Sequence, residues 1–129
     1  MSITNPMGAT SMPGSDLNSA ISQLKGRVLS SVEFVQDYVQ LRFDGPCLTA
    51  YTHPVVDLGT DRFVWGASGY RDRLCERIGS TVVEAWANEA EVSVGFESGV
   101  VVSVSLRDED YIGPEAIQFT SEDGSVWVA

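Results

Sequence analysis

The pattern of apolar and polar positions predicts a short helix near the start of the chain. Apolar residues recur at helical spacing within residues 17–24, and Gly26 follows them as a stop signal. Ser15 or Asp16 precedes them and is the expected N-cap. Residues 1–14 combine small and polar residues without periodicity, which favours a flexible N-terminal tail.

After this helix the apolar spacing changes to two, which predicts strands. Val39, Leu41 and Phe43 lie on one face of an extended run, whereas Gln40 and Arg42 lie on the other. Residues that favour turns separate such runs. The expected strands lie in residues 28–34, 38–43, 47–52, 81–86, 91–96, 100–106, 116–119 and 125–128.

A second helix is expected in residues 69–78. Its apolar positions share one face, Ser68 precedes it as a cap and Gly79 ends it. Residues 53–67 contain two glycines and a proline without a sustained period, so they are expected to form a long connector.

The order of one helix and three strands therefore occurs twice. Gly26 and Gly79 are 53 residues apart, as are Phe43 and Phe96, and no gap is needed between them. Each half alone would leave one apolar face uncovered, so two halves packed together would close a common core. The alternative is a coincidental similarity between generic strands.

These elements predict an α+β fold in which two short helices pack on an antiparallel meander sheet or a partly open barrel. The sheet would contain roughly six to eight strands in two pseudo-repeated α-β-β-β halves. The expected organisation is a tail (1–14) and a single domain (15–129), the latter divided into half one (15–52), a connector (53–67), half two (68–106) and a C-terminal hairpin (107–129).

The charge of the chain limits its partners. Eight basic and eighteen acidic residues give a net charge of −10, and a field of that sign repels phosphate backbones and anionic membranes. No nucleic-acid or membrane partner is therefore expected. The acidity serves either solubility or the steering of a basic protein partner, and the sequence leaves both open.

Two further features indicate the compartment. The chain has no apolar run near the roughly 20 residues of a membrane span, and its N-terminus has no charged or apolar signal region. Two cysteines are too few for a disulfide framework. A cytoplasmic location with reduced thiols is therefore expected.

No catalytic constellation is recognisable, so the chain is not expected to be an enzyme or to hold a cofactor. His53 is the only histidine, and there is no nucleophile elbow and no phosphate-binding loop. His53, Asp57 and Asp61 recur every four residues, but this spacing gathers ligands only on a helix. Pro54 and Gly59 argue against a helix there, so no metal site is expected.

Two surfaces are the candidate partner-binding sites. Phe63, Trp65 and Tyr70 flank a glycine-containing segment, where they form either a binding tip or a lid folded back over the core. The acidic run Asp108-Glu109-Asp110, near Glu115, either complements basic groups of a protein or is a solvated turn.

A resemblance to known proteins adds a functional expectation. The run VQLRFDG at residues 39–45, the run GPEA at residues 113–116 and Trp127 resemble short, acidic, uncharacterised bacterial proteins over most of residues 24–128. In size, charge and meander style the chain is also similar to the acidic immunity proteins that neutralise toxins in bacterial competition. That resemblance implies a non-catalytic module that binds a basic protein, and it transfers no functional residue.

Two other functions stay open at this point. The first is a small-molecule-binding or enzymatic domain with its site between the two halves, with His53, Asp57 and Asp61 at the mouth. The second is a structural homo-oligomer in which strand edges or the connector aromatics pair between copies.

Overall fold

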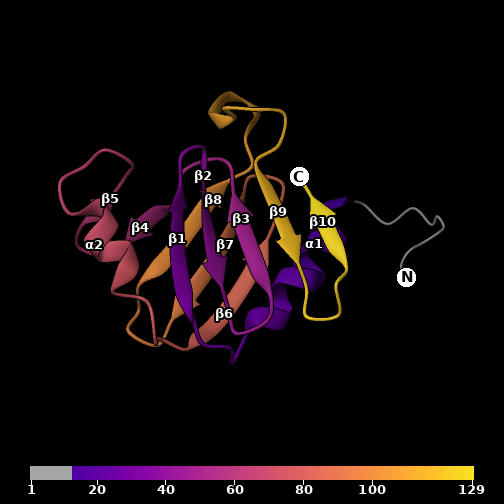
Figure 1. Cartoon of the computed structure of the whole chain (residues 1–129), viewed down its shortest axis with the longest axis horizontal. Helices are drawn as coiled ribbons and strands as arrows, with labels where there is room; N and C mark the ends of the chain where they lie inside the picture. Colours follow the sequence, from indigo (N-terminus) through magenta and orange to yellow (C-terminus); the bar gives the residue numbers. More distant parts are fainter. Residues whose placement is uncertain (1–12) are drawn as a thin grey trace.

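The computed structural model describes residues 13–129 as two antiparallel sheets with two helices (Figure 1). The strands of the first sheet are β1 (Ser31–Val35), β2 (Tyr38–Arg42), β3 (Cys47–Ala50), β9 (Ile117–Thr120) and β10 (Val126–Val128). Those of the second are β5 (Arg62–Phe63), β4 (Val55–Asp57), β8 (Val101–Ser105), β7 (Glu91–Phe96) and β6 (Val82–Ala87). The helical elements are α1 (Pro13–Ile21), η1 (Ser22–Leu24), α2 (Tyr70–Cys75) and η2 (Asp108–Asp110).

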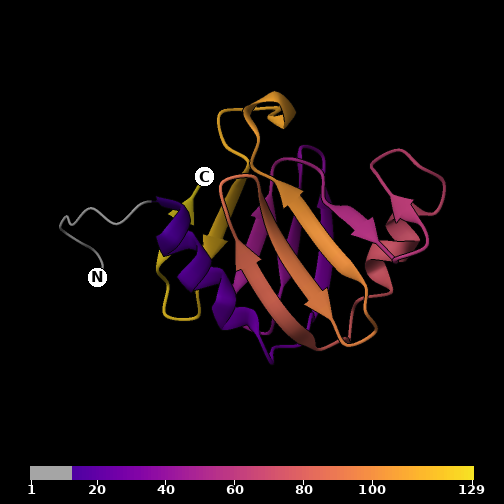
Figure 2. The same ribbon diagram turned by 180° about the vertical axis from the view of Figure 1, so that it is seen from behind.

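The α+β class is confirmed, but the prediction of one meander sheet or a partly open barrel is wrong. The two sheets are separate and not closed, and they lie as two layers one behind the other (Figures 1 and 2). The inward side chains of both layers form one buried core cluster. The chain is therefore a sandwich whose core lies between the sheets.

Two crossovers explain why the strands divide into two sheets. After β3 the chain leaves the first sheet through residues 51–54, and β4 then pairs with β8. After β8 it leaves the second sheet through residues 106–116, and β9 then pairs with β3. Each sheet thus joins a meander from one half of the chain to a hairpin from the other.

The predicted connector at residues 53–67 is wrong in part, because it contains β4 and β5. These strands have three and two residues, too few for an alternating pattern to stand out. The predicted C-terminal hairpin is present in β9 and β10, which pair Phe119 with Trp127.

Each helix lies beside the first strand of the other half's meander. The α1 helix packs against β6, where Asn18 Oδ1 accepts a hydrogen bond from the Ala87 N–H at 2.9 Å (Figure 2). The α2 helix packs against β1 and β4, and the Tyr70 hydroxyl donates to the Pro54 carbonyl at 2.6 Å. Together the helices bury apolar side chains at two sides of the sandwich.

The predicted helix caps are wrong. The α1 helix begins at Pro13, where a fixed φ suits the first turn, so Ser15 and Asp16 lie inside it. The α2 helix begins after Gly69, whose φ of 84° excludes an ordinary cap, and Ser68 does not cap it. Apart from its last two residues, the predicted tail lies outside the described residues.

A short backbone crossing joins the two halves between their first strands. An isolated antiparallel bridge pairs Val28 with Thr81. Four hydrogen bonds of 2.8–3.1 Å surround it. On one side, the Gly26 N–H donates to the Val82 carbonyl and the Val82 N–H donates to the Arg27 carbonyl. On the other, the Gly79 N–H donates to the Leu29 carbonyl and the Leu29 N–H donates to the Ser80 carbonyl.

Within residues 13–129, neither helix has the length and apolar character that a membrane crossing requires. Cys47 and Cys75 are free, with Cys47 half-buried and Cys75 exposed.

Two phenylalanines that lie 53 residues apart supply a test of the core. Phe43 and Phe96 are 0% and 2% exposed, so Phe43→Ala or Phe96→Ala removes a fully packed ring. Either substitution should lower the free energy of unfolding, measured in urea, by about 3–5 kcal/mol. Val83→Ala is the control, because Val83 is 44% exposed on β6 and should change stability by no more than about 0.5 kcal/mol. A loss below about 1 kcal/mol at both phenylalanines would contradict a shared core.

Candidate functional site

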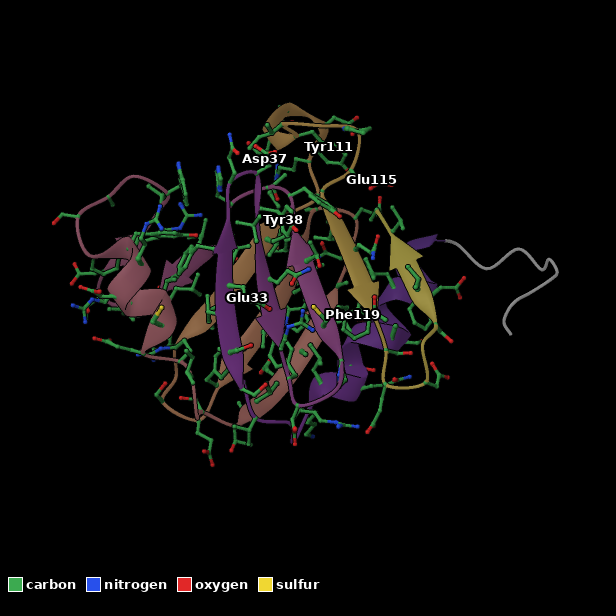
Figure 3. All side chains as sticks on the ribbon, in the orientation of Figure 1. Glu33, Asp37, Tyr38, Tyr111, Glu115 and Phe119 are labelled. Atoms are coloured by element: carbon green, nitrogen blue, oxygen red, sulfur yellow. The ribbon has the colours of Figure 1, made fainter. Side chains whose placement is uncertain are left out.

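A cavity of about 450 Å³ lies at the end of the sandwich where the two crossovers run. The tip of the β1–β2 hairpin and both crossovers contribute to its wall. Figure 3 shows Asp37, Tyr111 and Glu115 gathered at this end of the molecule. The lining residues are Gln36, Asp37, Tyr51, His53, Ile112, Gly113, Pro114 and Glu115.

Hydrogen bonds hold the crossovers in place beneath this cavity. The N–H groups of Tyr51 and Thr52 both donate to the Ala116 carbonyl, at 2.7 and 3.2 Å. The Thr52 hydroxyl donates to the Ser105 carbonyl at 2.9 Å. The first crossover is therefore fixed to both ends of the second.

Aromatic rings pack behind His53, which lines the cavity. The His53 ring lies flat on Trp65, with centroids 4.0 Å apart and planes 6° from parallel. Trp65 in turn meets the edge of Tyr70 at 5.8 Å, and Tyr51 meets the edge of Tyr38 at 5.7 Å. His53 is thus part of a packed cluster rather than an isolated loop side chain.

Phe63, Trp65 and Tyr70 were expected to form either a binding tip or a lid over the core, and the structure shows them in different environments. Tyr70 is 2% exposed and its hydroxyl is hydrogen-bonded in the core, as the lid alternative expects. Phe63 is half-buried, as the lid alternative expects. Trp65 is 41% exposed and is the one of the three that presents a large aromatic surface to solvent.

Guanidinium groups pack on the same aromatic cluster. The Arg71 guanidinium carbon lies 4.9 Å from the Phe34 ring centroid and 5.2 Å from that of Trp65. Arg73 lies 5.8 Å from the Phe63 centroid and also bonds to Glu76. A planar cation on an aromatic face is therefore a contact that this protein already makes.

Burial determines the protonation of His53. It lowers the pKa of the imidazole below its usual 6.5, and Nδ1 is buried without a hydrogen-bond partner. The ring is therefore neutral at pH 7, and Nε2 is the nitrogen left for a ligand.

The acidic residues predicted from the sequence lie on the second crossover. Asp108, Glu109 and Asp110 form the exposed η2 turn, and the Ser105 hydroxyl donates to Asp110 at 2.6 Å. Glu115 is half-buried in the cavity wall. The residues lining the cavity include no lysine or arginine, so its field is negative.

Sequence reasoning missed Asp37 and Ile112. Asp37 lies in the short turn between β1 and β2, Ile112 lies in the loop after the acidic run, and neither belongs to a motif that indicates chemistry. Ile112 is 67% exposed, the largest exposure among the exposed large apolar side chains of the described residues. An isolated isoleucine beside four acids was a signal that could have been noticed.

His53, Asp57 and Asp61 do not come together. His53 lines the end cavity, whereas Asp57 lies on the outer side of the second sheet and accepts a hydrogen bond from the Gly59 N–H. Asp61 is exposed in the turn before β5. Within residues 13–129, no group of three or more His, Cys, Asp or Glu side chains is placed to hold a metal ion.

The lowered pKa of His53 predicts a pH-dependent stability. Between the folded pKa and 6.5 the unfolded chain binds more protons, so the free energy of unfolding should fall as pH falls through that window. Urea unfolding of the wild type and of His53→Phe at pH 7, 6 and 5 tests this. The phenylalanine keeps a ring on Trp65 but cannot titrate, so the wild type should lose more stability than the variant. Parallel losses would show that His53 does not titrate in this window.

Comparison with known proteins assigns the chain to no family. No protein-family model, no curated protein and no solved structure matches it.

Proposed function

We propose that this chain is a non-catalytic acidic module that binds a basic surface of a protein partner, as an immunity-type inhibitor covers a toxin. The observation that carries the proposal is an exposed isoleucine, Ile112, set among the carboxylates of the second crossover.

This arrangement has the anatomy of a protein interface. Ile112 supplies an apolar centre, and Asp108, Glu109, Asp110 and Glu115 supply a charged rim on the same segment. A net charge of −10 adds long-range attraction for a positive partner. An inhibitor of this type needs only to cover its target, so it needs no catalytic group of its own.

A small-molecule site is the second candidate. The end cavity, at about 450 Å³, has a volume typical of small-ligand pockets, and His53 lies in its wall. Asp57 and Asp61, expected at the mouth of such a site, lie elsewhere and take no part in it. A homo-oligomer through the β10 edge, where Val126 and Val128 are exposed, is the third candidate.

We also propose that the chain arose by duplication of an α-β-β-β unit. The hairpins β1–β2 and β6–β7 pair Phe34 with Val39 and Ala87 with Val92, which is the same register 53 residues apart. The bridge between Val28 and Thr81 joins positions with that same separation. In each sheet the third strand of the meander pairs with a strand from outside that meander: β3 pairs with β9, and β8 pairs with β4.

The difference between the halves supports the site assignment. Residues 51–54 form a direct crossover, whereas residues 106–116 add the η2 turn and the Ile112 loop. In repeat architectures such insertions often lie on the binding face.

Neutralising the η2 turn tests the binding proposal. A binding partner is first isolated by affinity capture with the wild-type protein. The triple variant Asp108→Asn/Glu109→Gln/Asp110→Asn should associate with this partner about tenfold more slowly than the wild type at low salt, because electrostatic steering depends on local charge. Association of the wild type should slow as salt rises and the Debye length falls to about 8 Å. Binding should also inhibit the partner's activity.

A matched control removes the same charge elsewhere. Asp44→Asn/Asp61→Asn/Glu97→Gln alters three exposed acids outside the end cavity, and its association should slow much less. Equal slowing by both triple variants would mean that net charge alone acts, and the η2 surface would lose its role.

Hydrogen exchange tests the pairing of the halves. The amides of Gly26, Leu29, Gly79 and Val82 form one reciprocal set, so all four should exchange with the same protection, that of global unfolding. Two amides of one half exchanging far faster than the two of the other would contradict an equivalent crossing.

A further inference from the structure

We propose that the end cavity binds an arginine side chain of the protein partner, with the guanidinium against the His53 ring and between the carboxylates of Asp37 and Glu115. This inference rests on the proposed protein-binding function and names the group that the cavity recognises.

The cavity is lined in part by the neutral imidazole of His53. Trp65 covers one face of the His53 imidazole at 4.0 Å, and Trp65 does not line the cavity. The part of the imidazole that the cavity meets is therefore the part that Trp65 leaves uncovered. Because Trp65 holds the ring in one plane, a planar ligand can stack on it with little ordering cost.

The cavity also offers two carboxylates that form no ion pair and come from two different segments. Asp37 lies at the hairpin tip and Glu115 at the end of the second crossover. Among the described residues, Glu33, Glu76 and Glu122 each bond to an arginine of the chain, whereas Asp37 and Glu115 have no such partner. A cation from outside is the complement to this pair.

The flat ring favours arginine over lysine. A guanidinium is planar, stacks on aromatic faces and offers five N–H donors in a fixed fork, whereas an ammonium is a compact, strongly hydrated charge. Arg71 already packs on Phe34 and Trp65 in the same cluster. The exposed Ile112 and the cavity share the loop of residues 112–115, so an arginine could enter beside the apolar anchor.

Short peptides test the pocket without a known partner. Acetyl-Gly-Arg-Gly-amide, its lysine counterpart and its citrulline counterpart are titrated into the full chain, and amide shifts are followed by NMR. The arginine peptide should shift residues 36–37, 51–53 and 112–115, bind about tenfold more tightly than the lysine peptide, and the citrulline peptide should not bind. Equal shifts from citrulline, or none from arginine at millimolar concentration, would overturn the proposal.

Variants of the cavity residues test which side chains contact the arginine peptide. Asp37→Asn/Glu115→Gln should weaken the arginine peptide by at least about tenfold, whereas Asp61→Asn/Glu97→Gln, which removes equal charge, should leave it unchanged. His53→Ala should abolish the preference for arginine over lysine, and His53→Phe should retain it. Equal weakening by both double variants would overturn the pocket, and the peptide series on the wild type decides the matter if a variant does not fold.

The outcomes separate this proposal from the proposed function. If a basic partner depends on the η2 acids but the arginine peptide does not bind, the pocket fails and the binding function stands. If the peptide binds but no protein partner depends on η2, the proposed protein-binding function fails while the guanidinium pocket stands.

Discussion

The fold depends on the backbone crossing between residues 26–29 and 79–82. In each half a glycine with φ near 90°, Gly26 or Gly79, follows the helical segment, and residues 26–29 then run alongside residues 79–82. This places the two meanders in different layers, where neither can close a core alone. Each third strand, β3 and β8, then pairs with a strand from the other half, so the core forms only when both halves are present.

The end cavity exists because the two crossovers, residues 51–54 and 106–116, differ in length. Both crossovers must pass from one layer to the other at the same end, and their backbone groups bond to each other through Tyr51, Thr52 and Ala116. The second crossover is longer than that connection requires. Its extra residues form an exposed loop on a fixed base, which presents side chains without weakening the sheets beneath.

Charge and packing act on different parts of the molecule. The core is apolar, and its stability comes mainly from burial between the layers. The acids are mostly at the surface, where they cost little and attract a positive group. At the end cavity, Glu115 is half-buried and burial keeps His53 neutral. The two carboxylates that line this cavity, Asp37 and Glu115, form no ion pair within the described part of the chain.

Eight of the ten strands in residues 13–129, the two helices and the acidic turn could be predicted from the sequence, because period and turn chemistry are local properties. The 53-residue offset is likewise visible in the positions of Gly26 and Gly79. Only the tertiary structure decided that the strands divide into two sheets, because pairing β3 with β9 rather than with β4 depends on contacts far apart in the chain. It also decided that His53 lies on Trp65 and shares a cavity with Asp37 and Glu115, since no periodicity relates residues that meet only where two crossovers run together.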